Sequence, residues 1–478
     1  MKIAISYPPL ESEKGTALLS QNRQFQWFNN PSFIYPMVPA YAATLLKQNG
    51  YNVIWDDGIA EKKTYSKWLD DIAKEKPELI AIETKTPVVK RHWKIIDDIK
   101  KIGCKVVLMG DHVTALPMES MQNSKADFVL TGGDYDFLLL NICNHLTKNE
   151  KLEPGIWYRD NGIKNTGKFV LEHDLKALPF IDRILTKWQM YKVNGNFKRL
   201  PGTYTMVGRD CWYGKCKFCS WPTLYPKFRV RKPSQLLDEI GYLIENFGIR
   251  EIMDDTGTFP VGSWLKEFCE GMISRGYNKK IKIDCNMRCN ALSSEEYSLM
   301  AEAGFRLLLF GLESANQETL DKINKNLKVE KIMESCRLAK EAGLYPHLTA
   351  MIGYPWETKE DAFNTIKLAK EIFKKGYADT LQATIVIPYP GTKLFDECKT
   401  NNLLLFEDWE RYDQREAVMK TTLTNEEIKE LTSGLYKVFW TPKYVLKKIT
   451  RIRDVDDVKY AFRGVGKIFG HLKDFYGK

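Results

Sequence analysis

Three cysteines lie close together in the middle of the chain, within the segment RDCWYGKCKFCSW at residues 209–221. Cys211, Cys216 and Cys219 fall within nine residues, and no fourth cysteine follows nearby. Thiolates bind soft metal ions and iron–sulfur clusters. A closed structural metal site has four protein ligands, whereas an open coordination position can bind a substrate. Three thiols on one loop therefore favour a cubane iron–sulfur cluster that keeps one iron without a protein ligand.

Other cysteines leave one alternative open. Cys285 and Cys289, in the later segment CNMRC, could complete a four-thiolate zinc site. The chain has ten cysteines in 478 residues, opens on MKIAISYPPL without the pattern of a secretory signal peptide, and has no apolar run of about 18 residues. These properties predict a cytoplasmic, reducing compartment, where clustered cysteines bind metal or react more often than they pair.

The segments that would position the cysteine loop alternate between strand and helix. In residues 1–150, apolar stretches alternate with amphipathic stretches of roughly 10–15 residues; the strand-like ones are KIAISYPP, YNVIWDD, ELIAIET, CKVVLMGD and DFVLTGG. This alternation predicts an α/β fold with a doubly wound, Rossmann-like parallel sheet, whose ligands bind beyond the carboxyl ends of the strands. Residues 151–200 are polar and rich in turn signals, which predicts a hairpin and a linker.

A second α/β series follows in residues 201–400. Its strand-like segments are TYTMVG, EIMDDT, KIDCNM, LLLFGLE, HLTAMIG and TLQATIVIP. Six units are too few for a closed eight-stranded barrel, so the pattern predicts a partial (β/α)6 barrel. The cysteine loop follows the first of these strands, which places it at the carboxyl-end rim. Residues 401–478 are predicted to be helical and to end in a basic tail.

The cysteine loop resembles the cluster loop of radical S-adenosylmethionine (SAM) enzymes, and the N-terminal third resembles their cobalamin-binding subgroup. The resemblance implies a [4Fe-4S] cluster held by Cys211, Cys216 and Cys219, with SAM bound to the free iron through its amino and carboxylate groups. In that family, one electron from the reduced cluster cleaves SAM to a 5′-deoxyadenosyl radical. The usual spacing has three residues between the first two cysteines, whereas WYGK makes four here.

Later segments resemble the SAM-binding strand ends of the family, in the expected order. In EIMDDTGTF, Asp254 and Asp255 would lie near the methionine amino group, although two such carboxylates could instead cap the next helix. In CNMRCNAL, Arg288 would lie toward the nucleoside.

The fourth and fifth strand ends complete the resemblance. In FGLESAN, Glu313 would accept the ribose hydroxyls, with Ser314 or Asn316 in support. In HLTAMIGYPWET, Gly353 and Pro355 would let the backbone approach adenine, and IVIPYPGTKL matches the sixth segment.

The loop GDHVTALP is the part of the first domain that most resembles the cobalamin-binding family. The resemblance implies that Gly110, Thr114 and Ala115 contact the corrin, with Gly132 in TGGDYDFLL on the following loop. His112 is a candidate axial ligand of cobalt, but it fits no Asp-x-His-x-x-Gly pattern, so a histidine that hydrogen-bonds the loop is the alternative.

The resemblance implies two kinds of reaction. In the first, the 5′-deoxyadenosyl radical converts an unactivated carbon of the substrate to a carbon radical, and methylcobalamin supplies the methyl group to that radical. In the second, radical chemistry oxidises, cyclises or rearranges a lipid, isoprenoid or tetrapyrrole, because the layout also resembles the anaerobic magnesium-protoporphyrin cyclase and the hopanoid-lipid radical enzymes. A cluster- and cobalamin-carrying sensor without turnover is a third possibility. No motif indicates the substrate or a catalytic residue, and the reductant implied is a flavodoxin or ferredoxin-type protein.

The net charge of +10 is concentrated at the C-terminus. Residues 441–478 hold ten Lys or Arg and four Asp, which contributes +6. Apolar residues recur there near helical spacing: Val445, Leu446, Ile449, Ile452, Val458, Phe462, Val465, Phe469 and Leu472. This pattern is typical of an interfacial helix on anionic lipid at the inner membrane face, or of a helix packed on the protein's own core. No nucleic-acid-binding module is recognisable, so a nucleic-acid partner is not predicted.

Overall fold

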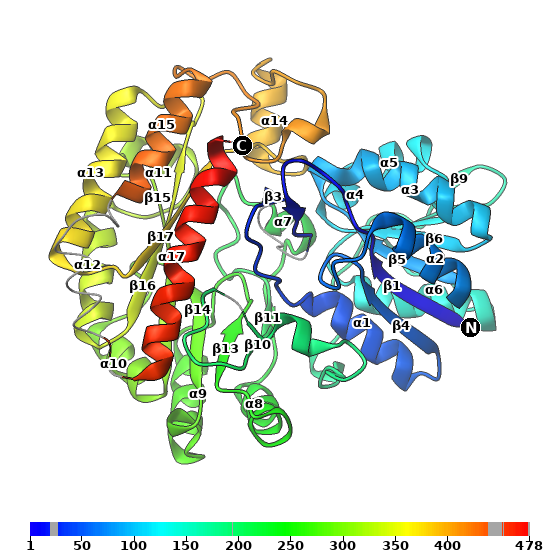
Figure 1. The fold of residues 1–478 in the computed structure, drawn as a ribbon, viewed down its shortest axis with the longest axis horizontal. Helices are drawn as coiled ribbons and strands as arrows, with labels where there is room; N and C mark the ends of the chain where they lie inside the picture. Colours follow the sequence, from blue (N-terminus) through cyan, green and yellow to red (C-terminus); the bar gives the residue numbers. More distant parts are fainter. Residues whose placement is uncertain (20–26, 194, 438–451, 453, 477–478) are drawn as a thin grey trace.

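The computed structural model describes residues 1–19, 27–193, 195–437, 452 and 454–476. Two largely parallel sheets lie next to each other, with the N-terminal sheet at the right of Figure 1 and the second at the left. One hydrophobic cluster includes buried residues of both regions, from Ile3 to Tyr436, so the two sheets and their helices share a core. The α/β class predicted from the sequence is therefore confirmed.

The first sheet has the doubly wound order. Across the sheet the strands are β4 (Asn52–Asp57), β1 (Lys2–Tyr7), β5 (Leu79–Glu83), β6 (Lys105–Met109), β7 (Phe128–Leu130), β8 (Ile156–Arg159) and β9 (Ile163–Asn165). The first five are parallel, and the chain reverses direction across the sheet between β1 and β5, which is where ligands of such sheets bind. The β8–β9 hairpin pairs antiparallel with β7, so the sheet continues past residue 150 to Asn165.

Six helices connect and cover the strands of this first sheet. They are α1 (Met37–Gln48), α2 (Tyr65–Glu75), α3 (Val89–Ile102), α4 (Asp111–Ala115), α5 (Pro117–Asn123) and α6 (Tyr135–Lys148). A small ribbon of β2 (Thr16–Ala17) and β3 (Trp27–Phe28) precedes α1. Short 3-10 helices occur at Thr86–Val88, Leu175–Ala177, Trp188–Tyr191, Tyr277–Lys279 and Trp409–Arg411.

The second sheet is a six-stranded parallel half-barrel whose strands follow one another in chain order. They are β10 (Gly202–Thr205), β13 (Glu251–Asp254), β14 (Lys282–Met287), β15 (Phe305–Glu313), β16 (Tyr345–Ile352) and β17 (Thr380–Ile385). The helices of this part are α7 (Trp221–Leu224), α8 (Pro233–Phe247), α9 (Ser263–Ser274), α10 (Ser294–Glu302), α11 (Gln317–Lys322), α12 (Val329–Glu341), α13 (Lys359–Lys375), α14 (Lys393–Thr400) and α15 (Asn425–Tyr436). The predicted partial barrel is confirmed; the predicted domain limits remain a proposal.

Local sequence explains where these helices begin and end. Ser293 and Thr358 are the N-caps of α10 and α13. The side chain of each accepts a hydrogen bond from the backbone N–H three residues later, and the acidic side chain of that later residue accepts one from the N-cap backbone N–H. Gly248 and Gly376 end α8 and α13 with φ of +60° and +78°, a conformation that glycine adopts without strain. Each strand therefore leads into a helix of defined length, and the strand ends gather at one rim.

Helix α17 (Val455–Tyr476) crosses the front of the half-barrel in Figure 1. Its first turn is held by ion pairs, including Asp456 to Arg250 at 2.8 Å and Asp457 to Lys198 at 2.8 Å. Among the described residues, no helix combines the length and apolar content needed to cross a bilayer. Val445, Leu446 and Ile449 of the predicted tail lie outside the described residues, and the side chains of Val465, Phe469 and Leu472 do as well.

Candidate functional site

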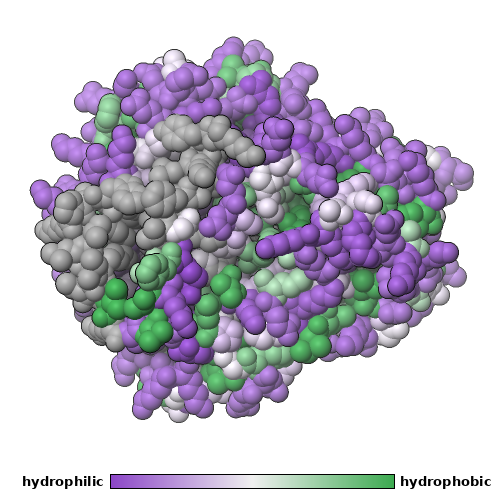
Figure 2. Space-filling view, viewed as in Figure 1, coloured by the Kyte–Doolittle hydropathy of each residue, from purple (hydrophilic) through white to green (hydrophobic). Residues whose placement is uncertain are grey.

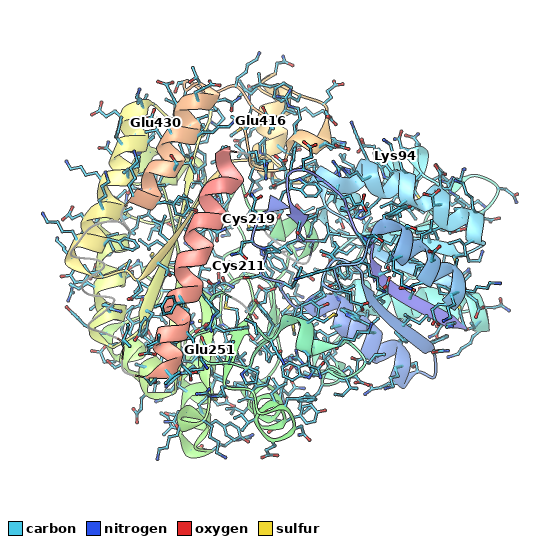
Figure 3. All side chains as sticks on the ribbon, in the orientation of Figure 1. Lys94, Cys211, Cys219, Glu251, Glu416 and Glu430 are labelled. Carbon is cyan, nitrogen blue, oxygen red and sulfur yellow. The ribbon has the colours of Figure 1, made fainter. Side chains whose placement is uncertain are left out.

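The three clustered cysteines lie on one loop with a fixed base. Strands β11 (Gly208–Arg209) and β12 (Arg229–Val230) pair antiparallel and close the loop of residues 210–228. Cys211, Cys216 and Cys219 are partly exposed, and all ten cysteines of the chain are free. Figure 3 places Cys211 and Cys219 near the middle of the molecule, between the half-barrel and the N-terminal sheet.

Hydrogen bonds tie the loop to the segment that follows α11. The Tyr213 hydroxyl donates to the Asn324 carbonyl oxygen at 2.6 Å, and the Lys217 N–H donates to the Ile323 carbonyl oxygen at 2.9 Å. The four-residue gap between the first two cysteines forms a turn in which Gly214 has φ of +57°. The extra residue is therefore accommodated in a turn anchored by Tyr213.

The closed zinc site that the sequence left open does not form. In the described ranges, no three His, Cys, Asp or Glu side chains are arranged to hold one metal ion. Cys285 is fully buried on β14, and Cys289 is buried just beyond it. A mononuclear zinc site needs its ligands around a single ion, whereas the thiolates of a cubane cluster bind separate irons. Within the described residues the three loop thiols do not form such a group either, so their role as ligands of one cluster remains a prediction.

A buried ion pair lies beside the cysteine loop and includes a residue that was not among the sequence candidates. Lys325 Nζ is 2.7 Å from Glu313 Oε1, and both side chains are at most 10% exposed. A Cβ on Gly311 would lie 2.1 Å from that carboxylate oxygen and 2.5 Å from the ammonium nitrogen, so a larger residue there would displace the ion pair. Burial raises the pKa of the Cys216 thiol, and the Lys325 charge counteracts the rise. Lys325 therefore favours thiolate formation on the loop.

Arg288 supports the same loop from the end of β14. Its Nη2 donates to the Lys325 carbonyl oxygen at 2.6 Å, and its guanidinium carbon lies 3.9 Å from the centroid of the Tyr213 ring. A cation over an aromatic face is attracted by the ring quadrupole. Arg288 thus positions the cysteine loop, and its predicted role toward the nucleoside remains a prediction.

The two adjacent carboxylates after β13 have different surroundings. Asp254 is buried and accepts hydrogen bonds from Thr205 Oγ1 at 2.7 Å and from the Val207 N–H at 3.1 Å. Asp255 is partly exposed, and its charge adds to burial in raising the pKa of Tyr204. The residue before α9 is Gly262, without a side-chain cap, so the helix-capping alternative was wrong. Asp254 holds the strand ends together, which leaves Asp255 as the carboxylate nearer to solvent.

The ends of β15 and β16 bring the remaining candidates to the same rim. Glu313 is the last residue of β15 and has φ of +58°; Ser314 Oγ then accepts the Asn316 N–H at 3.2 Å. Gly353 follows β16 with φ of +101°, and Pro355 is partly exposed in the same turn. The structure therefore gathers these predicted residues at one edge of the half-barrel, while their binding roles remain predictions.

Glu357 holds the turn after β16 and was not a sequence candidate. Its Oε2 accepts the Gly353 N–H at 2.6 Å, while its Oε1 has no hydrogen-bond partner within the described residues. Burial outweighs that hydrogen bond and raises the pKa of Glu357 from its ordinary 4.5 to about 7. The folded protein therefore retains a proton that the unfolded chain has lost above about pH 4.5.

We expect Glu357 to make stability fall as the pH rises. The contribution is full below pH 4.5 and is lost as the pH rises to about 7, which amounts to roughly 3 kcal/mol. In Glu357→Gln, the difference in the free energy of unfolding between pH 5 and pH 8, measured by urea denaturation, should shrink by most of that amount. Glu360→Gln, an exposed acid on α13, is the control. An unchanged pH dependence in Glu357→Gln would contradict this assignment.

In the first domain, the predicted corrin loops lie at the carboxyl-end edge of the sheet. Thr114 Oγ1 donates to the Gly110 carbonyl oxygen at 2.7 Å and accepts the Gly132 N–H at 3.2 Å, so it links the two loops. Gly110 has φ of +126°, and a Cβ there would lie 2.3 Å from the Thr84 carbonyl oxygen. Ala115 is partly exposed, and its Cβ would be 2.9 Å from a Cβ on Gly391 of the half-barrel. The loops therefore face the second domain.

His112 is enclosed by protein groups. Its Nδ1 lies 3.2 Å from Thr86 Oγ1, its Nε2 lies 3.3 Å from Glu119 Oε2, and its ring packs edge-on against Trp409 at 5.4 Å. Both nitrogens face protein oxygen atoms, Nε2 without a hydrogen bond in the described part of the chain, and the side chain is fully buried. This geometry favours the loop-supporting role of His112 over the role of an axial cobalt ligand.

Buried polar groups with unused hydrogen-bonding capacity lie at the same edge. Lys85 Nζ is 3.5 Å from both Glu83 Oε1 and Asp111 Oδ2, too far for strong bonds, and neither Lys85 Nζ nor Glu83 Oε1 has a hydrogen-bond partner in the described ranges. Buried polar groups normally find partners. An amide-rich ligand such as a corrin would supply donors and acceptors here, so the residues fit that group.

Comparison with known proteins identifies the class. Residues 205–369 match the model of the radical SAM superfamily. An uncharacterized methyltransferase of Pyrococcus horikoshii is 28% identical over 91% of this chain and 94% of its own length. The anaerobic magnesium-protoporphyrin IX monomethyl ester cyclase of Cereibacter sphaeroides is 25% identical over 92% of this chain and 71% of its own length. A hopanoid C-3 methylase of Methylococcus capsulatus is 23% identical over 44% of this chain and 38% of its own length.

Two solved structures share the fold over essentially the whole chain. The radical SAM methyltransferase TsrM of Kitasatospora setae, with cobalamin and a [4Fe-4S] cluster bound, has a TM-score of 0.69 at 14% identity and covers 100% of both chains. The cobalamin-dependent radical enzyme OxsB, with aqua-cobalamin bound, has a TM-score of 0.70 at 14% identity and covers 99% of this chain and 72% of its own.

Residues 205–369 of the half-barrel are therefore a radical SAM domain, and the chain is an enzyme. A domain of this class uses a [4Fe-4S] cluster, SAM and a reductant. The predicted resemblance to the anaerobic cyclase and the hopanoid enzymes is confirmed, and TsrM shares the fold over the whole chain.

Proposed function

We propose that this enzyme methylates an unactivated carbon of a small-molecule or lipid substrate in a cobalamin-dependent reaction. The proposal rests on two sets of loops that face each other. One is the cysteine loop at the rim of the half-barrel, and the other is the pair of predicted corrin loops at the edge of the first sheet. Tyr225, within the cysteine loop, donates its hydroxyl to the Gly133 carbonyl oxygen at 2.9 Å. When bound, the cluster and SAM supply a 5′-deoxyadenosyl radical, and cobalamin supplies the methyl group.

The chain's own residues have distinct tasks in this proposal. Cys211, Cys216 and Cys219 ligate the cluster, and Asp255 and Glu313 bind SAM at the half-barrel rim. The partly exposed side chains on the inner face of the strands would contact the substrate; they include Met253, Leu309, Thr349 and Gln382.

The experiment is anaerobic reconstitution with iron, sulfide, SAM and methylcobalamin. We expect the protein to retain corrin absorbance after gel filtration and to release 5′-deoxyadenosine with dithionite or a flavodoxin or ferredoxin-type donor. Corrin loss with 5′-deoxyadenosine release would instead favour radical oxidation, cyclisation or rearrangement. A fully loaded cluster without 5′-deoxyadenosine would indicate a sensor and overturn the enzymatic proposal.

Helix α17 supports peripheral contact with a membrane at the inner face. Val455, Val458 and Phe462 are 67%, 38% and 77% exposed and recur at helical spacing on one face, next to the exposed Lys459. Figure 2 shows an apolar patch at the lower left, where Figure 1 places the start of α17. An exposed apolar stripe in a tail of charge +6 suits an anionic lipid surface. A lipid contact would bring a lipid or isoprenoid substrate within reach.

We expect Phe462→Glu to weaken binding to anionic vesicles roughly tenfold or more, because losing the burial of one phenylalanine costs about 1.5 to 3 kcal/mol. Cosedimentation with vesicles of anionic and of zwitterionic phospholipid measures the effect. Phe363→Glu is the matched control, since Phe363 is an exposed phenylalanine on α13. Equal loss in both variants, or no binding of the wild type, would remove the proposed contact.

A further inference from the structure

Both ends of the cysteine loop are held by one carboxylate of the N-terminal domain. Arg209 lies just before the loop and Arg229 just after it, paired with each other across β11 and β12. Arg209 Nη1 is 3.0 Å from Asp134 Oδ1, and Arg229 donates to both oxygens of Asp134 at 2.6 and 2.8 Å. Asp134 lies at the end of the loop that contains Gly132, one of the predicted corrin contacts.

Further charged groups complete this buried cluster. Arg209 also binds Asp136 through both of its terminal nitrogens. His173 lies between Asp134 Oδ2, at 3.1 Å, and Glu153 Oε2, at 2.9 Å. The side chains of Arg209, Asp134 and Asp136 are at most 2% exposed. Arg209 and Asp136 are therefore paired away from solvent, whereas Glu153, 38% exposed, forms the outer edge of the cluster.

The surrounding backbone is packed just as closely. The Gly133 N–H donates to the Leu224 carbonyl oxygen at 3.0 Å, and a Cβ on Gly133 would lie 1.9 Å from the Tyr225 ring. On the other side, Gly132 donates to Thr114, which is bonded to Gly110. A continuous set of contacts thus runs from the corrin loops through residues 132–136 to the cysteine loop.

Movement of either loop alone would separate buried charges. Removing one partner from a buried ion pair is strongly destabilising, because the remaining charge is left uncompensated in a low-dielectric interior. The two loops are therefore expected to shift together, so a ligand that orders one of them also orders the other. Ordering that is shared in this way gives a coupling free energy between the two sites. Binding at either site then strengthens binding at the other by the same factor.

We propose that Asp134 is a positioning residue that couples the two cofactor sites, so that assembly of the cluster on the cysteine loop strengthens cobalamin binding at the N-terminal loops. This inference rests on the proposed function. Asp134 acts through Arg209 and Arg229 and is not expected to contact either cofactor.

The test compares hydroxocobalamin affinity, by equilibrium dialysis, with and without the reconstituted cluster. In the wild type we expect binding to be at least ~5-fold tighter with the cluster, the lower end of typical coupling. In Asp134→Asn the ratio should fall toward one. Arg229→Lys keeps the positive charge but loses the bidentate hydrogen bonds to Asp134, so it should lower the ratio too. This second variant keeps the test valid if Asp134→Asn does not fold. Asp284→Asn removes an equally buried aspartate, paired with Arg306 at 2.6 Å, and should keep the wild-type ratio.

Two outcomes would overturn the coupling: a wild-type ratio of one, or a full ratio in both Asp134→Asn and Arg229→Lys. A wild type that binds no cobalamin would refute that part of the proposed function alone. The coupling is then decided by hydrogen–deuterium exchange of residues 131–137. Slower exchange on cluster assembly in the wild type, lost in Asp134→Asn, supports it; equal exchange with and without the cluster refutes it.

Discussion

Alanine at any one of Cys211, Cys216 and Cys219 is expected to abolish cluster assembly and 5′-deoxyadenosine formation. Each thiolate would hold a separate iron, so two remaining ligands leave a second iron without a protein ligand and the cluster open to loss. Iron and sulfide analysis after anaerobic reconstitution, together with single-turnover assays with SAM and dithionite, measures the effect. We expect 5′-deoxyadenosine to fall below detection in all three variants.

The control for this prediction is Cys269→Ala. Cys269 is fully buried on α9, in the hydrophobic core. Its loss removes little more than a thiol from the core, so iron content and turnover should remain near wild-type values. A Cys216→Ala protein that still carries a complete cluster would show that one of the three thiols is not a ligand. Because the gap between Cys211 and Cys216 is one residue longer than usual, the variants of these two cysteines are the decisive test of the predicted ligand set.

Lys325→Met is expected to destabilise the protein by about 3 to 5 kcal/mol and to abolish tight SAM binding. The substitution leaves Glu313 as an unpaired buried charge, which is the costly way to break a buried ion pair. It also removes the cation that favours the Cys216 thiolate. Urea denaturation gives the stability change, and equilibrium dialysis of SAM on the reconstituted protein gives the binding change.

A double-mutant cycle separates the ion pair from other effects. Glu313→Gln combined with Lys325→Met removes both charges, so it should recover part of the stability that either single change loses. Lys322→Met is the matched control, because the pair of Lys322 with Glu318 is largely exposed and should contribute under about 1 kcal/mol. Equal stability losses in Lys325→Met and Lys322→Met would show that Glu313 does not depend on its buried partner.

Much of the fold could be predicted from short-range patterns. The apolar stretches KIAISY and NVIWDD became parallel neighbours in the first sheet, as their alternation with amphipathic segments indicated. The six strands of the half-barrel also occur in the predicted order. Strand and helix periodicities are local properties, and loop residues at strand ends reach one rim once the strands are parallel.

The roles of individual side chains could not be read in this way. Asp254 and Asp255 are adjacent in the sequence, yet one is bonded within the strand ends and the other is partly exposed. His112 belongs to a family-like loop, but Thr86, Glu119 and Trp409 enclose its ring. Each difference depends on neighbours that come from distant parts of the chain.

The sequence by itself determined that three thiols share one loop, that the loop follows a strand, and that the strands belong to two parallel sheets. These features depend on residue spacing within a few turns or strands. Only the tertiary structure decided that Lys325 pairs with Glu313 beside the cysteine loop and that Asp134 holds both ends of that loop. Arg209 and Asp134 are 75 residues apart, and no local pattern records a contact between them. Such contacts arise because packing buries both charges together, and burial without a partner would be prohibitively unfavourable.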